Sequence, residues 1–340
     1  MNTQEEIEEY LNDLLEQTEE ELDRVFAERL KTILNQLAEM HRKYSKDGVI
    51  SRTEMYKYKR FEKEMQFIKD NMQEHYAGVY TAISGLMVSQ YRNNYMHSAH
   101  LYEIAAKEDM GYQIPSVQTI KEIISNPIKE LTLPKILTQH RNEIIRNIRI
   151  EIAQGIQAGE SYSEMAARLE QRVEFSRQKA RRVARTEAGR AQTLGRLKSI
   201  EQAKKYAETD EFWMAELDKK TRKAHRKLDG QERGEDGLFH YKGMKAPGPS
   251  LWGVASMDIN CRCDIGTKIN GMFPNLRRAR DYDNADYQRK LAKKIDEIMA
   301  DEGKTEKQAT RKAKRLVYPP NKVIDYINYD EWYKSLKDKG

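Results

Sequence analysis

The residues most able to do chemistry are concentrated between Asp218 and Cys263. This stretch holds both cysteines of the chain, Cys261 and Cys263, and two of its seven histidines, His225 and His240. Cysteine thiolates and imidazoles are typical zinc ligands, and side chains two residues apart on a strand point to the same side. We therefore predict that these four residues could bind one zinc ion. The alternative is that the cysteines are small buried apolar residues.

A catalytic alternative uses the carboxylates of the same stretch. Metal-dependent phosphodiesterases hold a divalent ion with carboxylates and can use a histidine as general base. The residues available for such a site are Asp218, His225, Asp229, His240 and Asn260. Their spacing does not fix a geometry, so a nuclease is an alternative to a structural role.

A structural role explains the pattern D-x-x-T-R-x-x-H-x-x-L-D-G with fewer assumptions. Aspartate accepts charge-assisted hydrogen bonds from arginine or histidine, threonine caps turns, and Asp-Gly favours a tight turn. We therefore expect a buried polar network that helps to specify the fold. In this network Asp218 pairs with Arg222 or His225. Thr221 caps the turn, and Asp229 begins the Asp-Gly turn.

An arginine-rich segment before this stretch contains R-T-E at Arg185, Thr186 and Glu187. The tripeptide could anchor its helix to the Asp218 loop, with Arg185 and Glu187 joining the network and Asn260 joining from the cysteine side. The alternative is a salt-bridged solvated face, since exposed ion pairs contribute only about 0–1 kcal/mol.

The composition favours long solvated helices in a reducing cytoplasm. Of the 340 residues, 34% are charged and 39% hydrophobic. No run of about 18 apolar residues occurs, and the start is acidic where a secretory signal would be basic and then apolar. Two cysteines separated by one residue cannot form a disulfide framework. We expect no membrane contact.

The formal net charge of +6 is unevenly distributed. Residues 1–40 are strongly acidic, whereas 172–227 and 277–315 carry most of the positive excess. Such surfaces could contact phosphate without reading bases, although most charge runs are solvated faces. The predicted nucleic-acid contacts are Arg181, Arg182, Lys204, Lys205, Lys219, Lys220 and Lys223.

The elements that position these residues are mainly helical. Apolar residues at spacings of three and four predict two N-terminal helices that form a hairpin, a helix from 134 to 159, and another that begins at Ser161 with an S-x-x-E capping box. Short strands are predicted at 211–218, 238–241 and 259–265, and a basic helix at 287–315.

We therefore predict an α+β protein with a mainly helical N-terminal region, a small module with a short antiparallel sheet, and a C-terminal helix. The predicted regions are an acidic helical interaction region at 1–133, a module at 134–271 and a basic helical tail at 272–340. Residues 110–134 hold several glycines and prolines and are the predicted linker.

The order of these motifs resembles the phage head morphogenesis family, the Mu F-like minor head proteins. The matching elements are the R-T-E helix, the strand with Trp213, the run from Asp218 to Gly230, an aromatic strand, a Pro-Gly loop, and N-C-R-C at 260–263. The resemblance covers roughly 134–266. It implies fold and role by analogy.

The resemblance implies a low-copy minor head protein of a tailed bacteriophage that joins the portal during procapsid assembly and supports DNA packaging, retention or delivery. Expected partners are the portal protein and also the scaffolding or major capsid protein. Expected locations are the host cytoplasm during assembly and the head interior near the portal vertex. No catalytic residue is expected, and the R-S-E-x-E pattern of ADP-ribosylating toxins does not occur. The alternatives are a DNA-binding protein that guides or protects genome ends, and the nuclease above.

Overall fold

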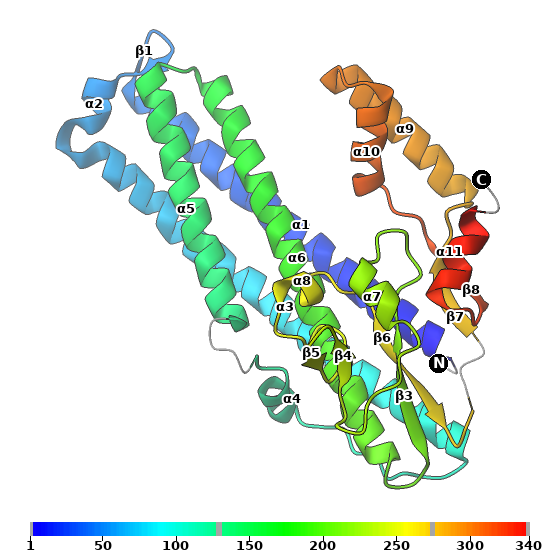
Figure 1. The fold of residues 1–340 in the computed structure, drawn as a ribbon. Helices are drawn as coiled ribbons and strands as arrows, with labels where there is room; N and C mark the ends of the chain where they lie inside the picture. The colour runs from blue at the N-terminus through cyan, green and yellow to red at the C-terminus, as the bar shows by residue number, and fades with distance from the viewer. Residues whose placement is uncertain (1–2, 127–130, 273–275, 338–340) are drawn as a thin grey trace.

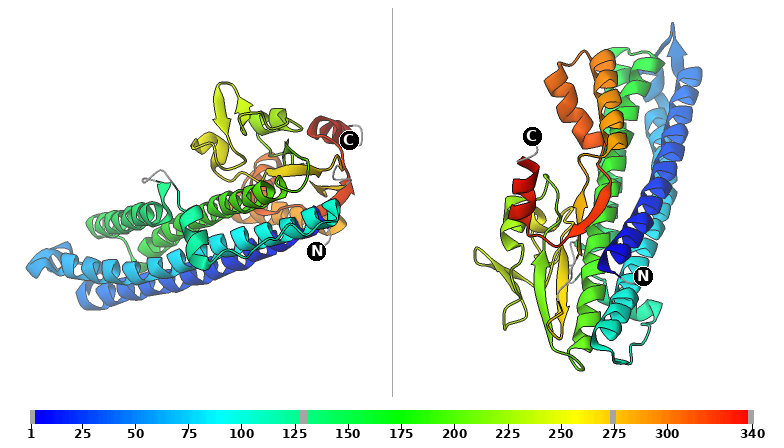
Figure 2. Two further views of the ribbon diagram at one scale, coloured as in Figure 1. Left: turned by 90° about the horizontal axis from the view of Figure 1, so that it is seen from below. Right: turned by 90° about the vertical axis from the view of Figure 1, so that its right-hand side faces the viewer.

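The computed structural model describes residues 3–126, 131–272 and 276–337. It consists of a long helical bundle, a small module with short strands along one side of the bundle, and a C-terminal helical hairpin (Figures 1 and 2). The predicted α+β class is confirmed. Among the residues described, no helix combines the length and apolar character needed to cross a bilayer.

The predicted N-terminal hairpin consists of α1 (Gln4–Tyr44) and α3 (Arg60–Ala106). The side chain of Thr3 caps α1 by accepting the Glu6 N–H at 3.2 Å. Asp47 and Gly48 then adopt positive φ angles. They form a tight turn that ends α1 and separates it from the next helix. The connection contains β1 (Ser45–Lys46), β2 (Val49–Ile50), α2 (Arg52–Tyr56) and the 3₁₀ turn η1 (Lys57–Lys59).

Three further helices complete the bundle region: α4 (Val117–Ile123), α5 (Leu133–Ala158) and α6 (Tyr162–Ala203). The predicted capping box is present, with Ser161 and Glu164 satisfying each other's backbone N–H groups. The short helix α4 lies in the predicted linker, of which 127–130 is outside the described residues.

One apolar core joins the helices of the bundle, and its members run from Leu22 to Ala191. At one crossing, a Cβ added to Gly195 of α6 would lie 2.4 Å from the carbonyl oxygen of Tyr91 in α3. Only glycine permits this close approach of two backbones.

The module is built from antiparallel strand pairs. β3 (Thr209–Met214) pairs with β6 (Asp264–Ile269), and Trp213 lies opposite Ile265. β4 (Phe239–Tyr241) pairs with β5 (Met244–Ala246). The short helices α7 (Lys223–Leu228) and α8 (Ala255–Asp258) lie in the connections. The predicted strand at 259–265 is wrong in its bounds, because Asn260 takes a left-handed φ of 59° and the strand begins only at 264.

The basic C-terminal region is not one helix. α9 (Ala285–Glu302) and α10 (Glu306–Leu316) form a hairpin broken at Gly303, whose φ is +58°. Strands β7 (Leu276–Arg280) and β8 (Asn321–Asp325) flank this hairpin and pair with each other, and α11 (Tyr329–Lys337) follows.

A second core fills the module and includes Trp213, Trp252, Ala279 and Trp332. It therefore draws residues from both sides of position 271, just as the bundle core crosses position 133. The division into three regions at residues 133 and 271 stays a prediction. Each of these two boundaries is crossed by one of the apolar cores.

Candidate functional site

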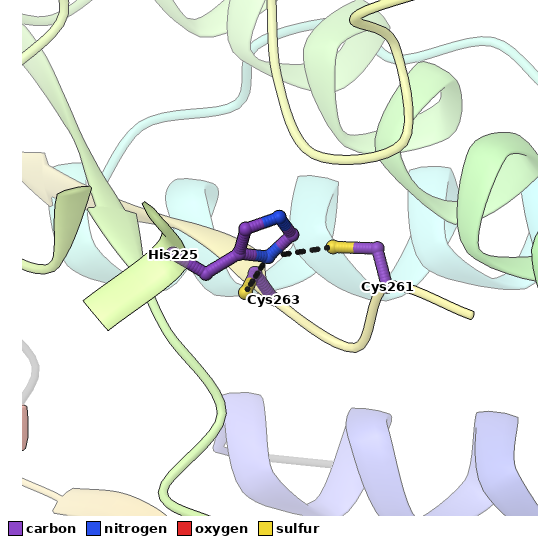
Figure 3. A group of neighbouring side chains, drawn as sticks. All are labelled: His225, Cys261 and Cys263. Atoms are coloured by element: carbon purple, nitrogen blue, oxygen red, sulfur yellow. Dashed lines mark hydrogen bonds between the residues drawn. The ribbon is translucent and has the colours of Figure 1, made fainter. Parts of the chain in front are cut away.

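His225, Cys261 and Cys263 form a compact cluster in the module (Figure 3). His225 Nδ1 lies 3.2 Å from the Sγ atom of Cys263 and 3.5 Å from that of Cys261. One ligand atom from each residue falls within 4.8 Å of the others. The imidazole is 2% exposed and packs edge-on against Trp213, with ring centroids 5.7 Å apart. Helix α7 supplies the histidine, and the segment before β6 supplies both thiols.

The two thiols differ electrostatically. Hydrogen bonds from Cys263 and then His225 lower the pKa of Cys261 well below its ordinary value, against the effect of burial. Burial and the neighbouring Cys261 raise the pKa of the Cys263 thiol well above its ordinary value. The pair therefore favours one thiolate, held by the hydrogen bonds around it.

The predicted set of four ligands is corrected in two respects. His240 lies on the exposed β4 hairpin, where its Nε2 is 3.0 Å from Asp236 Oδ1, and it does not join the other three residues. The cysteines precede β6 and do not lie on a strand, so alternation along a strand does not explain their convergence. The turn at Asn260 brings the thiols toward His225 instead.

Asp218 has different partners from those predicted. Its Oδ2 is 2.6 Å from Arg262 Nη1, and its Oδ1 accepts the Tyr282 hydroxyl at 2.6 Å and the Lys220 N–H at 2.8 Å. Burial opposes ionisation, but Arg262 and Tyr282 hold the pKa of Asp218 below its ordinary value. The arginine of N-C-R-C is therefore the main counter-ion of the Asp218 loop.

The remaining members of the run support turns. The Thr221 hydroxyl donates to the Glu216 carbonyl at 2.7 Å, as expected of a residue that closes a turn. Arg222 donates to the carbonyl oxygens of Met257 and Ile259, which fixes the α8 loop.

Asp229 does more than begin a turn. Its carboxylate accepts the N–H groups of Ala215 and Tyr329, both at 2.7 Å. It also forms a two-pronged ion pair with Arg277, with contacts of 2.5 and 3.0 Å. Arg277 donates in turn to the carbonyls of Ala215 and Ile327. This pair joins β3, β7 and the start of α11.

A second buried ion cluster surrounds Glu216. Arg278 and Arg280 alternate with Arg277 on β7 and reach Glu216 at 3.4 and 3.2 Å. Although burial disfavours its charge, Arg278 and Arg280 help to hold the pKa of Glu216 below its ordinary value. Arg278 also lies 3.2 Å from Glu8 of α1, and burial raises the pKa of Glu8 to about 7.

The sequence interpretation missed the arginines of β7, although R-R-A-R contains a usable signal. On a strand, Arg278 and Arg280 face one side and Arg277 the other. This alternation predicts two acidic clusters on opposite faces, which Glu216 and Asp229 supply.

The R-T-E tripeptide ties α6 to two other segments. Arg185 pairs with Glu19 of α1 and not with Asp218. The Thr186 Oγ1 accepts the Asn260 N–H at 3.1 Å, which ties α6 to the cysteine segment. Glu187 pairs with buried Arg190 at 2.7 Å.

The predicted phosphate contacts are partly neutralised within the chain. Arg181 lies 2.5 Å from Glu19, and Lys204 lies 2.6 Å from Glu211. The acidic N-terminal helix therefore covers part of the basic face of α6. The members that are exposed and form no ion pair among the described residues are Arg182, Lys205, Lys219 and Lys223, whereas exposed Lys220 is attracted by Asp218.

The geometry favours a structural site over a phosphodiesterase. Asp218 and Asp229 both face arginines, so neither carboxylate is free to hold a divalent ion in this arrangement. His240 lies elsewhere. The polar residues instead connect α6, α7, β3, β7 and the cysteine segment, while His225 and the two thiols could hold a soft metal ion.

The chain belongs to the Phage Mu protein F like family, whose model matches residues 146–266, from α5 into β6. The resemblance to Mu F-like minor head proteins is thereby confirmed.

The similarity extends beyond that module. The chain is 43% identical over 337 residues to the minor head protein GP7 of Bacillus phage SPP1, covering 98% of this chain and 97% of that protein. It is also 34% identical over 203 residues to the NAD(+)–arginine ADP-ribosyltransferase EFV of Enterococcus faecalis, covering 59% of this chain and 41% of that protein. No solved structure matches the chain significantly. The near-full-length similarity supports a structural role in the phage head.

Proposed function

We propose that this protein is a low-copy head component that joins the portal vertex during procapsid assembly and supports DNA packaging, retention or delivery. The observation that carries the proposal is the 43% identity to a minor head protein, which extends over the helical bundle as well as the module. The similarity therefore covers almost the whole of both chains and not a shared module alone.

The structure supports an architectural role in a second way. A 41-residue helix such as α1 is about 62 Å long at 1.5 Å per residue, so the bundle offers extended sides for protein contacts. The module is fastened to the bundle by charged side chains, because Arg278 of β7 lies 3.2 Å from Glu8 of α1 and Arg196 of α6 lies 3.1 Å from Asp264 of β6. The portal protein is the proposed partner, and the scaffolding or major capsid protein is a further one.

Co-expression of the full chain with the portal protein tests this proposal. We expect the two to co-purify and the protein to appear in procapsids and virions in a few copies per particle. A phage lacking the protein should form heads with altered DNA content or infectivity. Absence of the protein from particles, together with no co-purification, would refute the proposal.

We also propose that His225, Cys261 and Cys263 bind one zinc ion that fastens α7 to the cysteine segment. With zinc bonds of about 2.0–2.3 Å in a tetrahedral arrangement, nitrogen and sulfur ligands lie about 3.6 Å apart. The observed separations of 3.2 and 3.5 Å are close to this spacing. The fourth position would fall to water or to a residue outside this cluster.

Metal analysis of the purified full chain separates this proposal from a purely hydrogen-bonded cluster. We expect about one zinc per chain, loss of the metal in Cys261→Ser and His225→Ala, and retention in His240→Ala. His240→Ala is the matched control, because that histidine lies outside the cluster. A wild-type chain that stays free of metal after dialysis against zinc would exclude the site.

A further inference from the structure

Arg29 occupies a core position of α1 at which an apolar side chain is expected. It lies three residues after Phe26 and four before Ile33, and both of these neighbours belong to the bundle core. Residues at spacings of three and four lie on the same face of a helix. Arg29 is accordingly 0% exposed. A charged side chain is therefore buried in the apolar interface between α1 and α3.

The charge of Arg29 has no acidic partner among the residues that the structure describes. None of its three guanidinium nitrogens makes a hydrogen bond of ordinary geometry. The guanidinium lies over the rings of Phe26 and Tyr76, with its central carbon 4.0 and 4.5 Å from the two ring centroids. Burial lowers the pKa of Arg29, and Tyr76 opposes that effect. These contacts recover only part of the hydration that a buried guanidinium loses, and they supply no negative charge.

Arg29 differs in this respect from the other arginines in the described interior. Three of them are almost fully buried, and each faces a carboxylate at 2.5 to 3.1 Å. A carboxylate is the usual way in which a protein balances a buried guanidinium. The three arginines are Arg190, Arg196 and Arg277, which pair with Glu187, Asp264 and Asp229.

A small void lies beside Arg29 in the same interface. Its volume is about 10 Å³, and its walls include Thr32 of α1 and both Asn71 and His75 of α3. A void of about 10–15 Å³ holds one particle of the size of a water molecule. The guanidinium nitrogens are covered, so the Arg29 side chain must turn toward the void to meet an occupant.

The walls of the void offer hydrogen-bond donors to an occupant. Burial and then the charge of Arg29 lower the pKa of His75, so its imidazole stays neutral at pH 7 and keeps one N–H. The Asn71 amide donates one N–H to the Phe67 carbonyl at 2.9 Å and keeps the second. A water molecule could accept from these groups, but it would leave the charge of Arg29 unbalanced.

We propose that Arg29 binds one monatomic anion, chloride, in the void between α1 and α3. The ion balances the buried guanidinium and joins the two helices of the N-terminal hairpin. A polyatomic anion is too large for a void that holds one particle. This site goes beyond the proposed function and does not depend on a portal or on a second ligand.

Urea unfolding of the full chain in two salts tests the proposal. Far-ultraviolet circular dichroism follows the helices, and sodium chloride is compared with sodium gluconate, whose anion is too large for the void. Both salts are used at about 200 mM, so that the screening of surface charges is the same. Chloride should lower the unfolding equilibrium constant by the factor 1 + [Cl⁻]/Kd, which is about 11-fold at about ten times Kd.

The variant Arg29→Met should abolish the difference between the two salts. It should still fold, because an apolar side chain of similar length is tolerated in place of a buried ion. The matched control is Arg24→Met, which removes an exposed arginine from the same helix and should keep the wild-type response. A second variant, Asn71→Leu, keeps the charge of Arg29 but removes a donor, and it should weaken the chloride effect.

The width of the chlorine NMR line measures binding to the folded chain directly. The wild type and Arg24→Met should broaden the line, and Arg29→Met should broaden it clearly less. Identical unfolding of the wild type in chloride and gluconate would overturn the proposal and leave water as the occupant. It is equally overturned if Arg29→Met and Asn71→Leu both respond to chloride as the wild type does, since the ion then binds elsewhere.

Discussion

Replacing Asp229 by asparagine should destabilise the module severely, because it removes one charge from a buried ion pair. The side chains of Arg277 and Asp229 are only 2% and 3% exposed. Asparagine keeps the size of the side chain but leaves the Arg277 guanidinium uncompensated. It also removes one of the oxygens that accept the N–H groups of Ala215 and Tyr329.

Breaking a buried pair from one side costs about 3–5 kcal/mol. The total stability of a folded domain is about 5–15 kcal/mol, so Asp229→Asn should remove about a fifth of it or more. The exposed pair of Glu62 and Arg149 provides the matched control, because those side chains are 54% and 46% exposed. The change Glu62→Gln is of the same chemical kind and should cost about 0–1 kcal/mol.

Urea unfolding followed by tryptophan fluorescence measures this difference. All three tryptophans of the chain, Trp213, Trp252 and Trp332, lie in the core of the module, so the signal reports that core and not the bundle. In a cycle with Arg277→Met, the coupling free energy should exceed about 1 kcal/mol, since the double variant no longer buries a lone charge. Additive effects, or a cost for Asp229→Asn no larger than that of Glu62→Gln, would refute the reasoning.

Three further predictions concern contacts that the long helices make with each other and with the module. Gly195→Ala should destabilise the bundle by about 1–3 kcal/mol in thermal unfolding followed by circular dichroism, because the new Cβ meets the Tyr91 backbone; Gly85→Ala in α3 meets nothing within 4 Å and should be neutral or stabilising. Because burial raises the pKa of Glu8 from 4.5 to about 7, its contribution is fully present below pH 4.5 and is lost as pH rises through 7. Glu8→Gln should therefore remove a fall of about 1–3 kcal/mol in unfolding free energy across that window, and unchanged pH curves would contradict this. Glu19→Gln should release α1 from α6, which faster amide hydrogen exchange in α1 would reveal; unchanged exchange would exclude this role for the ion pairs.

The local pattern of the chain predicts much of the helical architecture and the family. Apolar spacing predicts α1 and the helical hairpin, and the capping box predicts the start of α6 at the correct residue. The prediction fails where a turn depends on one backbone angle. Gly303 splits the basic helix into two, and the left-handed Asn260 delays β6 to residue 264.

The candidate site divides in the same way. Residue types alone single out His225, Cys261 and Cys263, because sulfur and imidazole ligands are rare and close in the sequence. The residue types do not exclude His240 from the metal site. Its position outside the cluster follows from the pairing of β4 with β5 in an exposed hairpin. Nor do the residue types reveal that Asp218 forms its ion pair with Arg262 and not with Arg222, which is closer in the sequence.

What the sequence determined by itself is therefore local and compositional: where helices begin, which stretch is polar, and which family its motifs match. What only the tertiary structure decided is which charges meet. Glu19 neutralises arginines more than 160 positions away, while Lys307 and Arg311 of α10 form no ion pair with any residue that the structure describes. Ion pairing depends on distances of a few ångströms between side chains, and those distances are set by the packing of the cores and not by separation along the chain.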